Sequence, residues 1–229
     1  GRGSVMDLII FDLDGTLIDS KLDLAHAVNA TRTHMGFGLL EHELIYSYVG
    51  NGAPVLIRRA LGPELPETEI QRALEFFLAY YRDHKLHFTH PYPGVRETLN
   101  ALSDEGKPMA VLTNKPVNIS RAILDGLDLA KHFFRVYGGN SFGEKKPDPI
   151  GLRTLFSAAN VARERTLMVA GTAVDIRTAR NAEVACAGVT YGFQPESLVT
   201  DPPDYVLERM EQLLDIVGSG ERAASDGII

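Results

Sequence analysis

The sequence predicts an α/β protein, a doubly wound parallel sheet that carries an inserted α-helical unit. Three observations support this fold class. Apolar runs of strand length recur along the chain, and a stretch with helical period follows each of them, as in successive βαβ units. One long segment near the N-terminus lacks such runs. The chain of 229 residues is 45% apolar and 23% charged, so it is long and apolar enough to bury a substantial core.

The predicted strands are short apolar runs that suit burial on both faces of a sheet. They cover residues 6–11, 109–112, 134–137, 167–170 and 184–189. The predicted helices cover residues 95–105, 117–126, 149–160, 174–182 and 208–217. Several of these helices stop where a Gly or a polar turn follows, as helix ends usually do. This order predicts a Rossmann-like core domain made of residues 1–19 and 93–229.

Residues 20–92 interrupt this alternation, because they contain no strand-like run and follow the pattern of successive amphipathic helices. We therefore expect an inserted α-helical domain over 20–92. Turns at 50–52 and 91–94 divide this segment, and the second marks the return to the core domain. A packed helix is predicted where apolar residues share one face at helical spacing, namely Ile70, Ala73, Leu74, Phe77, Leu78 and Tyr81.

The charge of the chain argues against several classes of partner. The formal net charge is -7 and the pI is about 5.5, and the Lys and Arg residues are dispersed, so we expect neither nucleic acid nor an anionic membrane as a partner. The first apolar run is far shorter than a membrane span and unlike a cleavable signal, so a cytoplasmic location is expected. We expect loose termini at 1–4 and 218–229. The sequence carries no signal of oligomeric state.

Two aspartates, Asp12 and Asp14, follow the first predicted strand directly. In an open α/β sheet, ligands bind beyond the carboxyl ends of the strands, so both carboxylates lie where a site belongs. Gly15 permits a turn that a side chain would resist. Because like charges repel unless a cation or a shared proton compensates them, the pair indicates a metal or a titrating acid. The alternative is an Asp-rich turn with a solvated helix cap.

Residues 12–17 read Asp-Leu-Asp-Gly-Thr-Leu and resemble the first signature motif of the haloacid dehalogenase superfamily. Later motifs follow in the expected order. Thr113, followed by Asn114, matches the second motif, and Lys146 before a proline matches the third. The Thr113 hydroxyl and nearby backbone N–H groups could hold a phosphoryl oxygen, and the expected phosphate-binding residues are Thr113, Asn114 and Lys146. Lys146 would offset the charge of the carboxylates and stabilise the phosphoryl group in the transition state.

The resemblance implies a phosphatase that acts through an aspartyl phosphate on a small phosphorylated metabolite. Asp12 would attack phosphorus, and Asp14 would protonate the leaving oxygen and then activate water. Mg²⁺ would bridge the Asp12 carboxylate, the Asp14 backbone carbonyl and the phosphate, with Asp175 as the remaining acidic residue of the metal site. Family members that dehalogenate generally lack the second acidic residue, so Asp14 favours phosphate chemistry.

The fourth motif departs from the family pattern. Residues 169–175 read Val-Ala-Gly-Thr-Ala-Val-Asp, and the alignment puts Gly171 where the family has an aspartate that binds Mg²⁺ directly. Only Asp175 of the two acidic residues is present, so water or Asp175 must complete the metal shell, and metal affinity should fall. A catalytically impaired, phosphate-binding relative is therefore an alternative to an active enzyme.

Within the superfamily, residues 49–54, 92–95 and 112–116 look like those of phosphoglycolate phosphatases. This resemblance implies that the inserted helices form a cap over the site and that the substrate is 2-phosphoglycolate. The candidate specificity loop is Gly50, Asn51 and Gly52, with Arg58 as a partner for a substrate carboxylate. A helix-connecting turn and a solvated helix face are the alternatives for the loop and for Arg58. Another small-metabolite phosphatase or a phosphomutase is the alternative activity.

Overall fold

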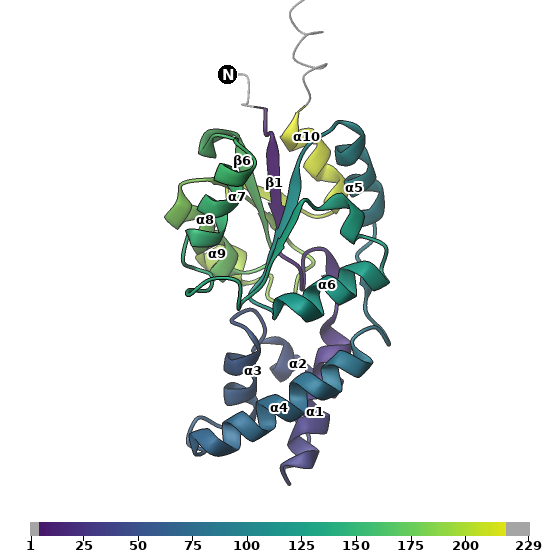
Figure 1. Ribbon diagram of the computed structural model, residues 1–229, viewed down its shortest axis with the longest axis vertical. Coiled ribbons are helices and arrows are strands. Elements are labelled where there is room, and N and C mark those ends of the chain that lie inside the picture. Colours follow the sequence, from purple (N-terminus) through teal and green to yellow (C-terminus); the bar gives the residue numbers. More distant parts are fainter. Residues whose placement is uncertain (1–4, 219–229) are drawn as a thin grey trace, which may run out of the picture.

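A six-stranded sheet, parallel throughout, forms the centre of the larger part of the molecule (Figure 1). The computed structural model describes residues 5–218, so the expected loose ends, 1–4 and 218–229, lie outside the described residues except for Gly218. The strand order is β5-β4-β1-β6-β7-β8. The strands are β1 (Leu8–Phe11), β4 (Met109–Leu112), β5 (Arg135–Tyr137), β6 (Thr166–Ala170), β7 (Ala185–Val189) and β8 (Tyr205–Leu207). The predicted fold class is confirmed.

Helices cover both faces of the sheet because its strands are apolar on both sides. In β1, Ile9 and Phe11 pack into one apolar cluster, and Leu8 and Ile10 into the other, as the two-residue period of a strand requires. The first cluster is covered by α5 (Val95–Asp104), α6 (Val117–Gly126) and α10 (Leu213–Val217). The second is covered by α7 (Ile150–Ala158), α8 (Ala173–Ala182) and α9 (Ser197–Thr200), on the opposite side in Figure 1.

Two predicted details of the core domain were wrong. The predicted helix 208–217 is a 3₁₀ turn, Met210–Gln212, followed by the short α10. Strand β8 was missed because it has only three residues, two of them exposed, so it lacks the apolar run that marks the buried strands. Further 3₁₀ turns lie at Ala130–His132 and Arg163–Arg165. Among residues 5–218, no helix is both long and apolar enough to cross a membrane.

The inserted segment folds into four helices that lie beyond one end of the sheet (Figure 1). They are α1 (Lys21–His34), α2 (His42–Tyr46), α3 (Ala53–Leu61) and α4 (Glu67–His84). Helix α4 packs against α1 and α3. Four residues of its predicted apolar face are buried and the other two are partly buried against the same core: Ile70, Ala73, Phe77 and Tyr81, then Leu74 and Leu78. We call these four helices the cap.

The chain enters and leaves the cap through two adjacent short strands. β2 (Ile18–Asp19) pairs antiparallel with β3 (His90–Pro91). The expectation of no strand within 20–92 was therefore wrong, because two residues are too few to leave a strand pattern in the sequence. The buried Asp23 carboxylate secures this hinge: it accepts hydrogen bonds from the backbone N–H groups of Phe88 and Thr89 and from the Thr89 hydroxyl. The exact boundaries 19/20 and 92/93 stay a prediction.

Candidate active site

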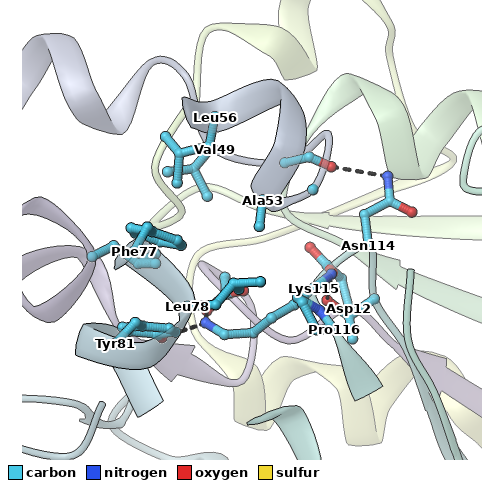
Figure 2. A pocket seen from close by; sticks show the side chains of 15 residues that line it. Asp12, Val49, Ala53, Leu56, Phe77, Leu78, Tyr81, Asn114, Lys115 and Pro116 are labelled. Atoms are coloured by element: carbon cyan, nitrogen blue, oxygen red, sulfur yellow. Dashed lines mark hydrogen bonds and ion pairs between the residues drawn. The ribbon is translucent and has the colours of Figure 1, made fainter. Parts of the chain in front are cut away.

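The site forms where the carboxyl ends of three neighbouring strands meet. β1 lies between β4 and β6, and their ends carry Asp12, Thr113 and Gly171. The Asp12 N–H donates to the carbonyl of Val169, 3.1 Å away. Gly15 has a φ of +79°, which confirms that the turn after Asp14 needs glycine. Asp12, Asp14 and Thr113 line one cavity between the core domain and the cap (Figure 2), with a volume of about 50 Å³.

Lys146 fixes the orientation of Asp12. Its ammonium group lies 3.0 Å from Oδ1 of Asp12, 2.5 Å from Oδ1 of Asp175 and 3.0 Å from the carbonyl oxygen of Leu112. These contacts use all three of its N–H groups. Burial opposes its charge, yet the two carboxylates raise the pKa of Lys146. Burial and the nearby Asp175 raise the pKa of Asp12 well above its usual range, against the attraction of Lys146.

Asp175 has a structural role in addition to its contact with Lys146. Its Oδ2 accepts hydrogen bonds from the N–H groups of Gly171 and Thr172, at 3.0 and 3.2 Å, and so closes the capping box that starts α8. Both carboxylate oxygens are thus engaged by protein donors. The role of Asp175 as a metal ligand stays a prediction, and in this structure its two carboxylate oxygens accept hydrogen bonds from Lys146, Gly171 and Thr172.

Asp14 is held by Lys115, a residue for which the sequence motifs predicted no role. Its Oδ1 accepts hydrogen bonds from the Ser20 hydroxyl at 2.5 Å and from the Lys115 ammonium at 2.8 Å. Lys115 also donates to the hydroxyl of Tyr81 on the cap helix α4. The sequence does contain one sign that Lys115 belongs to the site, because it lies two residues beyond the strand-end Thr113. Its partner Tyr81 is distant in sequence, so the pairing itself leaves no local pattern.

The two residues of the second motif, Thr113 and Asn114, have different roles. Thr113 lines the cavity, and its hydroxyl oxygen accepts the N–H of Lys115 at 3.1 Å, which leaves its proton available for a ligand oxygen. The Asn114 amide instead donates to the carbonyls of Gly50 and Lys146 and accepts the N–H of Lys146. Both of its side-chain N–H groups are used, so the Asn114 side chain joins the loop at Gly50 to the third motif, and phosphate binding by Asn114 stays a prediction.

Only two of the four predicted specificity residues line the cavity. Gly50 and Gly52 line the cavity, and Gly52, with φ of +94°, would bring a side chain within 3.1 Å of the Asn114 carbonyl. Asn51 lies outside the cavity lining and accepts a hydrogen bond from Arg59. Arg58 pairs with Glu67 at 2.6 Å and its side chain is 41% exposed. Arg58 is not among the residues that line the cavity, and its predicted contact with a substrate carboxylate stays a prediction.

Gly171 lies directly against the side chain of Thr16. The Thr16 hydroxyl is the buried side-chain oxygen that has no hydrogen-bond partner among residues 5–218. A Cβ added at Gly171 would lie 2.7 Å from this oxygen. Within the same residues, no group of three or more His, Cys, Asp and Glu side chains is arranged to hold a metal. Position 171 therefore supplies no carboxylate to this part of the site.

The remaining oxygens still fit a hard divalent cation. Lys146 occupies Oδ1 of Asp12 and leaves Oδ2, and no described backbone N–H donates to the carbonyl oxygen of Asp14. Mg²⁺ is commonly held by one or two carboxylates together with substrate phosphate and water. The site also holds three carboxylates, Asp12, Asp14 and Asp175, against the two ammonium groups of Lys115 and Lys146, so an added cation is electrostatically favourable.

Comparisons with known proteins place this site in context. The family model for haloacid dehalogenase-like hydrolases matches residues 9–189. The chain is 42% identical over 219 residues to the phosphoglycolate phosphatase of Vibrio vulnificus (strain YJ016), covering 92% of this chain and 95% of that relative. It is 38% identical over 218 residues to the phosphoglycolate phosphatase of Pseudomonas syringae pv. tomato (strain ATCC BAA-871 / DC3000), with 93% and 80% covered.

A solved structure of a similar protein has the same fold. The chain is similar to the crystal structure of a predicted phosphoglycolate phosphatase from Haemophilus somnus 129pt, with a TM-score of 0.89 and 32% sequence identity, covering 93% of this chain and 98% of that one. These similarities confirm the resemblance predicted from the sequence motifs.

Proposed function

The chain belongs to the haloacid dehalogenase-like hydrolase family and is a phosphoric monoester hydrolase of small molecules, and on this premise we propose that it hydrolyses 2-phosphoglycolate to glycolate and phosphate. The observation that carries the proposal is the cavity of about 50 Å³ in which Asp12 and Asp14 face the cap. A water needs roughly 10–15 Å³ of such space, so the cavity favours a leaving group of very few atoms. The names of the relatives support this substrate class.

The reaction begins with attack of Asp12 on phosphorus. Lys146 binds one oxygen of Asp12, and the free Oδ2 forms the bond to phosphorus while the bond to the ester oxygen breaks. The product of this step is an aspartyl phosphate on Asp12. The Thr113 hydroxyl, at the edge of the same cavity, donates a hydrogen bond to a phosphoryl oxygen, which stabilises the negative charge that this oxygen carries in the transition state.

Asp14 transfers the protons of both steps. Ser20 and Lys115 both donate to its Oδ1, so Oδ2 is the oxygen that carries and delivers the proton. It protonates the departing glycolate oxygen, and it then accepts a proton from the water that hydrolyses the aspartyl phosphate. The second step returns Asp12 to a carboxylate and Asp14 to an acid, and inorganic phosphate leaves.

The divalent metal that such enzymes generally use is proposed here to be Mg²⁺, held by the Asp12 carboxylate and the Asp14 carbonyl oxygen. When bound, it would supply positive charge to the phosphoryl oxygens. The residues around it have separate tasks: Lys146 orients Asp12, and Lys115 orients Asp14. The cap closes the cavity and limits the access of bulk water to the aspartyl phosphate.

A substrate panel tests the proposal. We expect phosphate release from 2-phosphoglycolate with a kcat/KM at least about 10-fold above that for larger sugar phosphates and for p-nitrophenyl phosphate, because only the small ester fits under the closed cap. Asp12→Asn is the control for contaminating phosphatase. Isomerisation without net phosphate release would identify a phosphomutase, an activity that the comparisons do not favour. A preference for a sugar phosphate would refute the proposed substrate.

A further inference from the structure

We propose that Lys115, which is hydrogen-bonded to Tyr81 of the cap, binds the carboxylate of the substrate. It thereby selects esters with an anionic leaving group. This inference rests on the proposed function and identifies its specificity residue. Of the described side chains that line the cavity, Lys115 is the only cationic one. Much of the remaining lining is apolar: Leu24, Val49, Ala53, Leu56, Phe77, Leu78 and Pro116. A carboxylate enters such surroundings only with a charged partner.

The position of Lys115 suits this task. It follows the strand-end Thr113, is 7% exposed, and reaches from the core domain across the cavity to the cap, as Figure 2 shows. Its ammonium group donates to Oδ1 of Asp14 and to the Tyr81 hydroxyl, and it lies 4.4 Å from the centre of the Tyr81 ring. An ammonium group has three N–H groups. Two have partners within residues 5–218, which leaves one for a ligand.

Tyr81 adds a second donor beside this N–H. Burial, with Asp14 and Asp23 nearby, raises the pKa of Tyr81 well above its usual value, so the hydroxyl keeps its proton. The hydroxyl oxygen already accepts a hydrogen bond from Lys115, and its own O–H has no acceptor in the described structure. Lys115 and Tyr81 therefore offer one N–H and one O–H to the same cavity, which matches the two oxygens of a carboxylate.

The distance from the reacting atoms also fits. In 2-phosphoglycolate, one CH₂ group separates the ester oxygen from the carboxylate. Asp14 protonates that ester oxygen, and the Lys115 ammonium lies 2.8 Å from Asp14. A substrate whose ester oxygen contacts Asp14 thus places its carboxylate beside Lys115. A neutral alcohol of the same size makes no comparable ion pair there, so the residue distinguishes substrates by the charge of the leaving group.

The test compares 2-phosphoglycolate with 2-hydroxyethyl phosphate, which has the same chain length and an uncharged CH₂OH in place of the carboxylate. Lys115→Met should lower kcat/KM for 2-phosphoglycolate about 100-fold more than for 2-hydroxyethyl phosphate, because it removes a hydrogen bond between charged groups. Lys145→Met removes a lysine charge outside the cavity lining and should change both substrates equally. If Lys115→Met lowers both substrates to the same extent, Lys115 only positions Asp14, and the inference is overturned.

Tyr81→Phe provides a second variant in case Lys115→Met does not fold. It keeps the ring and removes the hydroxyl, and it should raise KM for 2-phosphoglycolate roughly 10-fold with little change for 2-hydroxyethyl phosphate. Equal effects on the two substrates would contradict the assigned role. The wild-type enzyme separates this inference from the proposed function: without a preference for 2-phosphoglycolate, the proposed substrate itself fails, whereas a preference that survives Lys115→Met refutes only the role of Lys115.

Discussion

At the scale of single residues, the position after β6 departs from the family pattern, because Gly171 supplies no carboxylate. The buried Thr16 hydroxyl beside it has no hydrogen-bond partner among residues 5–218. Because position 171 adds no carboxylate to the proposed ligands, we expect Mg²⁺ to bind weakly and to need a high concentration for full activity.

Gly171→Asp should tighten Mg²⁺ binding, by roughly 10–100-fold, since it adds a charged oxygen ligand. The new Cβ would lie 2.7 Å from the Thr16 hydroxyl, which must rotate away. This rotation breaks no hydrogen bond, because that oxygen has no partner among the described groups. Gly171→Ala crowds Thr16 equally without adding a ligand, so calorimetry should find no tightening for it. Equal Mg²⁺ affinities for wild type and Gly171→Asp would mean that another group already fills the position.

At the scale of elements, the hinge between α1 and β3 depends on one buried charge. Asp23→Ala removes the acceptor of the Phe88 and Thr89 N–H groups and should lower the free energy of unfolding by about 3 kcal/mol in urea titrations. Asp23→Asn keeps one acceptor oxygen and should cost less. The exposed Asp83 of α4 is the matched control, and Asp83→Ala should change stability by less than about 0.5 kcal/mol. A loss for Asp23→Ala no larger than that of the control would show that solvent satisfies these donors.

The elements that could be predicted are those with a strong local pattern. Strands β1, β4 and β6 are fully buried apolar runs, and the packed face of α4 repeats at helical spacing. The two-residue β3 and the edge strand β8 have no such pattern. Within the site, Asp12, Thr113 and Lys146 follow from motifs along the sequence. The partners of Lys115 and Asn114 do not, since each contact joins the core domain to the cap across a long separation in sequence.

At the scale of the whole molecule, hydrogen bonds join the cap and its α2–α3 loop to the core domain around the cavity. Lys115 binds Tyr81, and Asn114 binds the Gly50 carbonyl. Gln194 from the core donates to carbonyls at the end of α2, with the shortest distance, 2.7 Å, to Val49. All four residues of the first two contacts also line the cavity, whereas Gln194 lies outside its lining. A substitution at Gln194 therefore tests the contact between cap and core domain without changing the cavity wall.

Gln194→Ala should therefore weaken closure without changing substrate choice. We expect kcat/KM to fall about 5-fold, the equivalent of roughly 1 kcal/mol for one hydrogen bond, and by the same factor for 2-phosphoglycolate and 2-hydroxyethyl phosphate. This uniform loss contrasts with the selective loss expected for Lys115→Met. Steady-state kinetics on both substrates checks it, and a loss confined to 2-phosphoglycolate would assign Gln194 to specificity instead.

In the proposed mechanism Asp12 accepts the phosphoryl group, because Lys146 holds it at the end of β1, where it lines the cavity. Beryllium fluoride, a phosphoryl mimic, bonds to the carboxylate that forms the aspartyl phosphate. The most direct measurement is the structure of the protein with beryllium fluoride and Mg²⁺. We predict an adduct on Asp12, and none with Asp12→Asn, whose turnover should fall by at least about 1,000-fold. An adduct on any other residue would contradict the mechanism.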